Sequence, residues 1–243
     1  MSTKILLNGF LGRMGQAIIE ASEGSDCEIA VKIDEGYNAE TLIDTVDAVI
    51  DFSTRDATLA IVELCAKYKK PIVIGTTGHS NEQRTEILQY TKQIPMVWAG
   101  NYSIGVNLLN YLTKLAAKIL PDSYDIEITE MHHKFKKDAP SGTATKLMKV
   151  CQDARDIPDT MLKFGREGIT GERPVNEIGV HALRGGSVIG DHTVIFAGDS
   201  ERVELSHFAG DRKIFAIGAL RAAKWVVSKT PDLYEMEDVL ELK

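Results

Sequence analysis

The stretch KILLNGFLGRMGQ, residues 4–16, decides the fold of this chain. Its first part, Lys4–Asn8, is a short apolar run that ends at a glycine, which is typical of a buried parallel strand. Apolar side chains then recur at spacings of three and four over Arg13–Ser22, which predicts a helix with one buried face. They are Met14, Ala17, Ile18 and Ala21. A strand that leads through a glycine-rich turn into a helix opens a dinucleotide-binding α/β domain.

The turn at residues 9–15 has a GxxGxxG spacing, and Leu11 stands where the usual pattern has its middle glycine. Glycines here allow a tight turn and let a pyrophosphate approach free N–H groups at the start of the helix. Asp34 ends the next predicted strand, where a carboxylate can bind ribose hydroxyls. A glycine turn without a ligand remains an alternative, but the order of strand, turn, helix and acidic residue favours a nucleotide.

Strand-like and helix-like segments alternate through the first hundred residues. The further predicted strands are 28–34, 48–52, 71–75 and 95–99, and the predicted helices are 58–67 and 82–91. Such alternation with short turns produces βαβ units and a parallel sheet with right-handed crossovers.

The pattern changes after about residue 103. The predicted elements are then a helix at 106–119, a strand at 125–133, a helix at 143–153, an exposed loop at 163–176, strands at 177–183, 187–197 and 202–208, and a helix at 215–227. A turn signal at Gly198-Asp199-Ser200 predicts that the last two strands pair antiparallel. The final helix has an apolar face that needs a partner surface.

We therefore expect an α/β protein of two domains. Residues 1–103 and 214–243 should form a Rossmann-like dinucleotide-binding domain with a parallel sheet. Residues 104–213 should form a mixed α+β domain with an antiparallel-rich sheet, for substrate binding and oligomerisation. Ligands are expected at the carboxyl ends of the parallel strands.

The composition excludes several classes of protein. Hydrophobic residues make up 44% and charged residues 26%, as in an ordinary globular protein. The net charge of −7 gives no electrostatic footprint for nucleic acid. No run of about 18 apolar residues and no secretory signal occur, so no membrane span is expected. Three separate cysteines without a CxxC pair indicate reduced thiols, and hence a cytoplasmic protein.

A second motif, EMHHKFKKDAPSGTA at residues 130–144, carries the candidate chemistry. Its histidines and lysines form a cationic cluster in an acidic protein. His132 and Lys136 are four residues apart, which places them on one side of a strand or of a helix. Residues 141–143 follow a proline and open a helix, whose free N–H groups can bind an anion. We call the helix start at residues 141–143 the anion seat. A cationic cluster beside it suits a small substrate with two carboxylates.

Two other interpretations of this motif stay open. It could be a solvated basic strand edge followed by an ordinary helix cap. Zinc is a weaker alternative, because adjacent histidines point to opposite faces of a strand and no cysteine lies nearby in the sequence. We expect no metal.

The chain resembles the 4-hydroxy-tetrahydrodipicolinate reductase (dihydrodipicolinate reductase) family of bacterial lysine and diaminopimelate biosynthesis. The matching pieces span the chain in order. They are GFLGRMG at 9–15, DFS at 51–53, GTTG at 75–78, AGNYSIGVN at 99–107, EMHHKFKKDAPSGTA at 130–144 and the C-terminal run that ends MEDVLELK.

The resemblance implies a role for each matching residue. His132 and Lys136 would be catalytic, and His133, Gly142 and Thr143 would bind the substrate carboxylates. The residues implied to bind the cofactor are Gly9, Phe10, Leu11, Gly12, Arg13, Met14, Asp34, Gly75, Thr76, Thr77, Ala99, Gly100, Asn101 and Tyr102. The implied reaction is the NAD(P)H-dependent reduction of a small cyclic imine dicarboxylate, 4-hydroxy-tetrahydrodipicolinate, to tetrahydrodipicolinate.

Departures from the family pattern bear on the cofactor. Leu11 replaces a small or basic residue, Glu35 stands where some relatives have arginine, and the connection from Asp34 to the next strand looks shortened. Two carboxylates repel the 2′-phosphate of NADPH, whereas Lys32 and Arg13 could neutralise it. We expect both cofactors to be used, with NADH moderately favoured.

The resemblance also implies a homotetramer. The predicted strands carry more apolar side chains than one covering helix needs, namely Val188, Val194, Phe196, Val203 and Leu205. Two other functions are less favoured. A non-catalytic redox sensor would leave His132 and Lys136 without a task, and a dehydrogenase of an aspartate-derived aldehyde would need another substrate signature.

Overall fold

The computed structural model describes residues 2–242, and the chain divides into two compact units. The first unit takes the residues up to Ile104 together with those from Arg212 onward. The second unit is Gly105–Asp211. The second unit is therefore inserted between two segments of the first.

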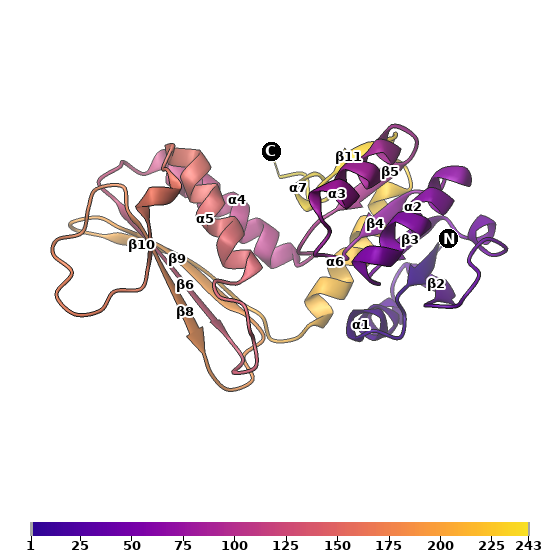
Figure 1. The fold of residues 1–243 in the computed structure, drawn as a ribbon, viewed down its shortest axis with the longest axis horizontal. Helices are drawn as coiled ribbons and strands as arrows, with labels where there is room; N and C mark the ends of the chain where they lie inside the picture. Colours follow the sequence, from indigo (N-terminus) through magenta and orange to yellow (C-terminus); the bar gives the residue numbers. More distant parts are fainter. Residues whose placement is uncertain (1, 243) are drawn as a thin grey trace. The chain divides into compact units, whose positions relative to one another are not determined.

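The first unit is built on a six-stranded sheet in which every neighbouring pair of strands is parallel (Figure 1). In spatial order the strands are β11 (Asp232–Tyr234), β5 (Pro95–Trp98), β4 (Ile72–Ile74), β3 (Ala48–Asp51), β1 (Thr3–Asn8) and β2 (Cys27–Ile33). The strand order reverses next to β1, because β2 pairs on one side of it and β3 on the other. Such a reversal is where α/β sheets bind ligands.

Helices cover both faces of this sheet. One layer contains α1 (Arg13–Ser22), α6 (Lys213–Val226) and α7 (Met236–Val239), and the other contains α2 (Arg55–Lys67) and α3 (Asn81–Leu88), which the 3₁₀ turn η2 (Gln89–Lys92) follows. Alternate residues of β1 supply the two cores: Ile5 and Leu7 pack with the α1 and α6 layer, and Leu6 packs with the α2 layer. The strand reads as a continuous apolar run because both of its faces are buried.

The connection between β2 and β3 is reduced, as the sequence indicates. It contains the 3₁₀ turn η1 (Ile43–Thr45) in place of an α-helix. The connection that follows β2 is therefore largely irregular. It lines the pocket at the carboxyl ends of β1 and β2 that is described below.

The second unit contains a five-stranded mixed sheet. In spatial order its strands are β10 (Arg202–Phe208), β9 (Asp191–Ala197), β6 (Asp125–His132), β8 (Ile178–Arg184) and β7 (Leu162–Phe164). Strand β9 is antiparallel to both β10 and β6, whereas β6, β8 and β7 are mutually parallel. The predicted fold class is confirmed, including the antiparallel pair β9–β10.

Helices α4 (Ile104–Ile119) and α5 (Gly142–Arg155) lie on the same face of this sheet (Figure 1). Two helices, and not one, cover the apolar strand residues that were expected to exceed the needs of a single helix. Val194 and Phe196 are fully buried in this core, and Val203 and Leu205 pack against it. These four side chains are therefore used by the core of this unit and do not form an exposed apolar surface.

Some short elements differ from the sequence prediction. Strand β7 occupies the start of the segment predicted as a loop, and residues 187–190 precede β9 without being part of it. The prediction also lacks β11, α7 and the 3₁₀ turn η3 (Asp159–Met161). Each of these has only three or four residues, which is too short to show a periodicity.

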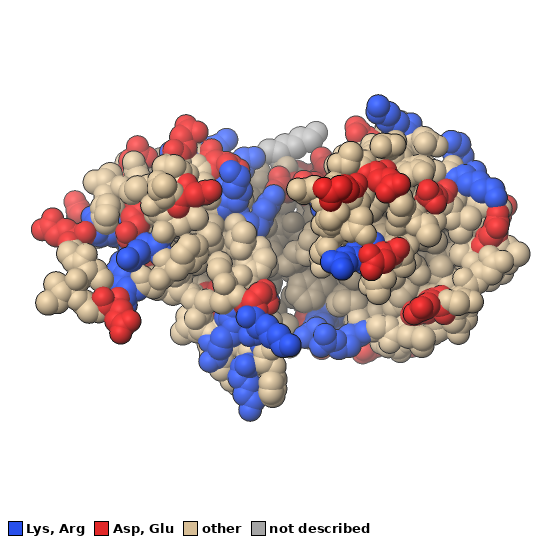
Figure 2. Space-filling view, in the orientation of Figure 1, with Lys and Arg blue, Asp and Glu red and all other residues tan. Residues whose placement is uncertain are grey.

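Acidic and basic side chains are mixed over the visible face, and Lys and Arg gather where β6 and β8 end (Figures 1 and 2). Among residues 2–242, none of the helices is long and apolar enough to cross a membrane.

Candidate active site

A pocket of about 860 Å³ lies at the carboxyl ends of β1, β2 and β3 in the first unit. Its lining includes Gly9 and Gly12 of the glycine turn and Asp34. Four carboxylates line it, namely Asp34, Glu35, Glu40 and Asp56, and its lining within the described chain includes no Lys or Arg. The volume suits part of a dinucleotide, and the carboxylates suit ribose hydroxyls.

The glycine turn is closely packed. Gly9 has a φ of +86°, and a Cβ there would lie 2.4 Å from the carbonyl oxygen of Phe52. A Cβ at Gly15 would lie 2.3 Å from the carbonyl oxygen of Gly9. Both glycines are therefore required for the turn to sit against the end of β3 and against α1.

Asp34 links the end of β2 to this turn. Its Oδ2 accepts a hydrogen bond from Leu11 N–H at 3.0 Å, and its Oδ1 accepts one from Glu35 N–H at 2.9 Å. Each carboxylate oxygen keeps a further lone pair for a ribose hydroxyl. The Leu11 side chain is 65% exposed, so it does not fill the turn.

Asp51, in the DFS motif, is a fully buried carboxylate at the end of β3. Its oxygens accept hydrogen bonds from four side chains on β1, α2 and the segments after β3 and β4. The donors are Asn8 Nδ2 at 2.8 Å, Ser53 Oγ at 2.5 Å, Thr58 Oγ1 at 2.9 Å and Thr76 Oγ1 at 2.9 Å. Burial raises the pKa of Asp51, although these hydrogen bonds act to lower it. Asp51 thereby holds together the loops that surround the pocket.

The remaining predicted cofactor residues have varied surroundings. The ring of Phe52 lies where a Cβ of Gly75 would be, only 2.1 Å away, while Thr77 is exposed. Tyr102 is 2% exposed, and its hydroxyl lies 2.8 Å from the carbonyl oxygen of Ile74. Burial raises the pKa of Tyr102. The Tyr102 side chain therefore supports the end of the sheet.

The other predicted cofactor residues, in the glycine turn and at 99–101, lie at the surface or against the core. Phe10 packs edge-on against Tyr37 with ring centroids 5.8 Å apart, and Met14 packs on the core. Arg13 is exposed at the start of α1. Ala99 and Asn101 are half-buried and Gly100 is exposed. Tyr37 lines the pocket, whereas these six predicted cofactor residues are not among its lining residues.

In the second unit, His132 ends β6 and contacts a buried ion pair. Its Nδ1 lies 2.6 Å from Glu130 Oε2. Arg184, at the end of the neighbouring strand β8, donates two hydrogen bonds to Glu130, each of 2.8 Å. Burial acts to raise the pKa of Glu130, but the hydrogen bonds from Arg184 and His132 outweigh it and lower that pKa.

Lys136 belongs to the same network. Its Nζ lies 2.9 Å from Asp138 Oδ2, and this contact lowers the pKa of Asp138. Arg184 Nη2 donates to the carbonyl oxygen of Asp138 at 2.7 Å. A chain of polar contacts therefore joins His132 to Lys136 through Glu130, Arg184 and Asp138.

Ser141 caps α5, as its position after the proline predicts. Its Oγ accepts a hydrogen bond from Ala144 N–H at 3.2 Å, and its own N–H donates to Glu130 Oε1 at 3.1 Å. Gly142 and Thr143 form the first turn of the helix. The first turn of α5 is therefore tied to the carboxylate that contacts His132.

His192 of β9 completes this cluster. Its Nε2 lies 2.9 Å from Ser141 Oγ, and its ring is edge-on to that of His132 with centroids 5.1 Å apart. Burial and the neighbouring His132 lower the pKa of His192 to about 4. His192 is therefore neutral at neutral pH.

The prediction that His132 and Lys136 share one side of a single strand or helix is wrong. Strand β6 ends at His132, and residues 133–140 form an irregular loop. His133 lies in this loop, and its buried Nδ1 lacks a hydrogen-bond partner within the part of the chain that the structure describes. The network, and not a shared strand face, connects the two predicted catalytic residues.

Sequence reasoning did not find Arg184 or His192, and it quoted Glu130 and Asp138 without a role. A signal existed for Glu130, because it lies on the same face of the predicted strand as Ile126 and Ile128, which predicts burial. Residues 2–242 contain no cluster of three or more His, Cys, Asp or Glu side chains that could hold a metal ion.

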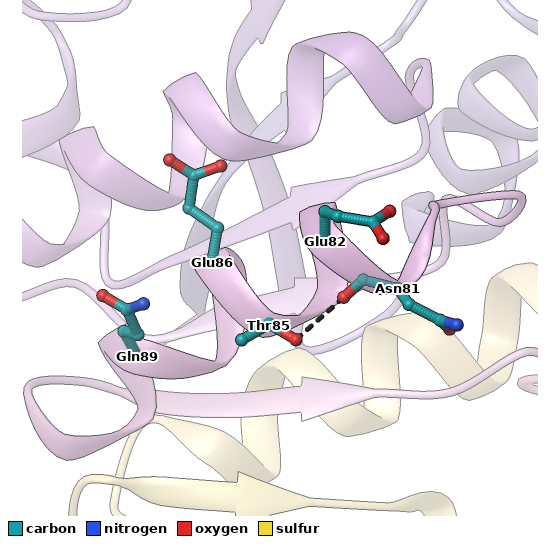
Figure 3. A pocket seen from close by; sticks show the side chains of 5 residues that line it. All are labelled: Asn81, Glu82, Thr85, Glu86 and Gln89. Carbon is teal, nitrogen blue, oxygen red and sulfur yellow. Dashed lines mark hydrogen bonds between the residues drawn. The ribbon is translucent and has the colours of Figure 1, made fainter.

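A second depression, of about 470 Å³, lies on one face of α3 (Figure 3). Its lining comes from this single helix and the turn that follows it: Asn81, Glu82, Thr85, Glu86 and Gln89. Thr85 Oγ1 donates to the carbonyl oxygen of Asn81 at 2.8 Å. All of these lining side chains come from one continuous segment, and no neighbouring helix or strand of the described chain supplies another. We therefore assign the depression no role.

A parallel dinucleotide fold with a glycine turn, together with a second unit that carries a histidine–lysine network, defines a nicotinamide-dinucleotide-dependent oxidoreductase. The chain belongs to the dihydrodipicolinate reductase family: residues 3–102 match the N-terminal part of the family and residues 105–240 match its C-terminal part.

Individual relatives agree with this placement. The 4-hydroxy-tetrahydrodipicolinate reductase of Akkermansia muciniphila is 50% identical over 241 residues, which cover 98% of each chain. That of Thiobacillus denitrificans is 43% identical, with 100% of each chain covered. Among solved structures, the dipicolinate-bound dihydrodipicolinate reductase of Paenisporosarcina sp. TG-14 shares the fold with a TM-score of 0.78. It is 24% identical, and the match covers 97% of this chain and 98% of that one.

Proposed function

We propose that this protein reduces 4-hydroxy-tetrahydrodipicolinate to tetrahydrodipicolinate with NADH or NADPH. The observation that carries the proposal is the network that joins His132, Lys136 and the N-terminus of α5 through Glu130. It combines two proton-transferring groups with an anion seat. The relatives from Akkermansia and Thiobacillus are both named as reductases of this substrate.

The substrate class follows from the charges of the site. Gly142 and Thr143 lie in the first turn of α5, where the helix dipole favours a carboxylate. His133 lies at the start of the preceding loop. A small ring with two carboxylates can bind at the helix end and at the cationic loop together. The solved relative from Paenisporosarcina binds dipicolinate, a ring of this kind.

The chemistry assigns a task to each catalytic residue. Loss of the substrate hydroxyl as water, with a hydrogen of the neighbouring ring carbon, gives a ring carbon–carbon double bond conjugated to the imine. A bound NADH or NADPH would supply the hydride for the far carbon of that double bond. Lys136, cationic beside Asp138, stabilises the negative charge that develops towards the ring nitrogen and donates the proton that the resulting enamine takes up. His132 relays protons to this position. Overall the substrate loses its hydroxyl and one ring hydrogen as water and gains one hydride and one proton.

The lining of the nucleotide pocket favours NADH over NADPH. Asp34 and Glu35 both line the pocket, and their negative charges would repel a 2′-phosphate on a ribose bound beside them. Glu40 is paired with Lys67, so its charge is compensated. Arg13 and Lys32 are exposed and outside the pocket lining, so they can approach a phosphate only by reorienting. Both cofactors are therefore used, with NADH moderately favoured.

The protein acts as a cytoplasmic homotetramer. The family resemblance supports this assembly, and the mixed sheet has both of its helices on one face. Leu183 and Phe208 on its strands are exposed, at 48% and 68%. Burying such a surface between subunits is favourable. Light scattering tests the assembly: a mass near the 26.7 kDa of one chain at micromolar concentration contradicts it.

One assay tests the activity. Purified protein is mixed with NADH and the product of the aldol condensation between pyruvate and aspartate semialdehyde, and loss of NADH absorbance is followed. Aspartate semialdehyde alone serves as the control. We expect rapid oxidation only with the condensation product. Oxidation with the aldehyde alone would instead support a dehydrogenase of another substrate class, and dinucleotide binding without turnover would support a redox sensor.

A further inference from the structure

The carboxylate of Glu130 is saturated with hydrogen-bond donors. Oε2 accepts from His132 and Arg184, and Oε1 accepts from Arg184 and from the main-chain N–H of Ser141. The four donors come from β6, β8 and the N-cap of α5. The Glu130 side chain is fully buried, so water does not compete for these positions.

We propose that Glu130 is a positioning residue that orients His132 and the carboxylate-binding end of α5 with a single carboxylate. This inference rests on the proposed function. Oε2 determines the orientation of the imidazole, and Oε1 fixes the residue that precedes Gly142 and Thr143. The proton-transferring group and the anion seat therefore keep a constant separation.

The contact also selects a tautomer of His132. An ionised carboxylate only accepts hydrogen bonds, so Nδ1 must carry a hydrogen and Nε2 is the nitrogen that gains or loses a proton. A Cβ at residue 190 would lie 3.0 Å from His132 Nε2. Because residue 190 is glycine, this nitrogen is not covered by a side chain on that side.

Arg184 determines whether Glu130 acts on His132 by its charge or by orienting the ring. Its guanidinium binds the same carboxylate through both nitrogens and compensates its charge. His192, whose ring packs edge-on against that of His132, is neutral at neutral pH and adds no charge there. Glu130 therefore acts on His132 chiefly by orientation. This distinguishes it from an isolated carboxylate that stabilises an imidazolium.

Glutamine at this position removes half of the acceptors. Its single amide oxygen can serve one side of the site, and its NH₂ group must then face donors on the other side. Either His132 or Ser141 loses its acceptor, whichever way the amide is placed. Arg184 remains partly buried beside an uncharged partner in both cases.

The experiment compares Glu130→Gln with Glu127→Gln. Glu127 lies on the same strand and is also held by arginines, Arg166 and Arg173, but it has no contact with His132 or Ser141 among its hydrogen bonds. We expect Glu130→Gln to lower kcat by about tenfold or more, to weaken dipicolinate binding several-fold, and to leave NADH affinity within about twofold of wild type. Glu127→Gln should keep kcat and dipicolinate affinity within about twofold.

A second readout is independent of turnover. In ¹⁵N-histidine-labelled protein, His132 should appear as the Nδ1–H tautomer, with the signal assigned by its absence in His132→Asn. Glu130→Gln should shift this signal or mix the tautomers, and Glu127→Gln should not. If Glu130→Gln fails to fold, the charge-balanced double variant Glu130→Gln/Arg184→Gln replaces it and must show the same losses.

The outcomes separate this inference from the proposed function. Wild-type protein without reductase activity contradicts the proposed function, and the tautomer measurement then still decides the role of Glu130. An unchanged kcat and His132 signal in Glu130→Gln would overturn the inference while leaving the reductase activity in place. Equal losses in Glu127→Gln would also overturn it, because they would show a general effect on the sheet.

Discussion

Lys136 Nζ lies 2.9 Å from Asp138 Oδ2, so the proposed proton donor is paired with a carboxylate two residues further along the loop. Asp138 is mostly exposed, whereas Lys136 is largely buried. The carbonyl oxygen of Asp138 also accepts a hydrogen bond from Arg184, so this short stretch of the loop is held at two points.

Lys136→Ala should lower kcat by about 10²-fold or more, because it removes the proton donor. His132→Ala should have an effect of similar size. Both variants should bind NADH normally, since the nucleotide pocket belongs to the other unit. Steady-state kinetics and NADH titration check this. Near wild-type turnover in Lys136→Ala would eliminate the role assigned to it.

Thr143→Val should mainly raise the substrate KM, because it removes a hydroxyl at the first turn of α5 while keeping the shape of the side chain. The helix end and the network around Glu130 remain, so kcat should change little. Substrate-dependence curves for this variant and the wild type give the comparison. A fall in kcat at unchanged KM would place Thr143 in the chemical step and contradict its assignment as a carboxylate ligand.

The nucleotide pocket should discriminate between the two cofactors by electrostatics. We expect kcat/KM to be moderately higher with NADH, and Arg13→Ala to reduce the value for NADPH more than that for NADH. The reason is that Arg13 is a cation near the turn, whereas Asp34 and Glu35 line the pocket. A preference for NADPH above about tenfold, or about 1.4 kcal/mol, would show that these carboxylates do not govern the site.

Asp51→Ala should lower the free energy of unfolding by about 3 kcal/mol, because it leaves several buried donors without their acceptor. Asp51→Asn should cost less, since the threonine and serine hydroxyls can rotate to accept from its amide. Both variants should weaken NADH binding, because Asp51 holds the loops around the pocket. Urea unfolding and NADH titration measure the two effects. Unchanged NADH affinity in a destabilised Asp51→Ala would limit Asp51 to a structural role.

Glu127 should make the protein sensitive to acid. Burial acts to raise its pKa, but hydrogen bonds from Arg166, His181 and Arg173 outweigh it and lower the pKa to about 2 from an ordinary value of 4.5. A lowered folded-state pKa contributes stability that is complete above the unfolded value and is lost as the pH falls towards the folded value. Between pH 4.5 and 2, wild-type Tm should therefore fall more steeply than that of Glu127→Gln. Parallel Tm curves for the two proteins would contradict this.

Most of the first unit is predictable from local pattern, because strands buried on both faces appear as apolar runs such as Ile72–Ile74. The glycine turn and the shortened connection after β2 are also visible. Strand β11 is not, because a three-residue strand at the sheet edge has no period to detect. The parallel pairing of β6 with β8 cannot be predicted from local pattern, because α5 and a long loop separate the two strands in the sequence.

The site is predictable only where its residues are close in sequence. The motif around His132 gives both proposed catalytic residues and the cap of α5. Arg184 reaches Glu130 through the β6–β8 pairing, and His192 reaches Ser141 from β9. Such partners depend on strand register across about fifty residues, which local patterns do not encode.

Transfer of deuterium from labelled NADH tests the central claim most directly. The protein is supplied with NADH carrying deuterium at both C4 positions and with the condensation product of pyruvate and aspartate semialdehyde, and the product is analysed by mass spectrometry. We predict tetrahydrodipicolinate with one deuterium on a ring carbon in wild-type protein, and far less of it in Lys136→Ala. Product without deuterium, or NADH oxidation without a reduced ring product, would contradict the assignment of this chain as a dinucleotide-dependent reductase of that ring.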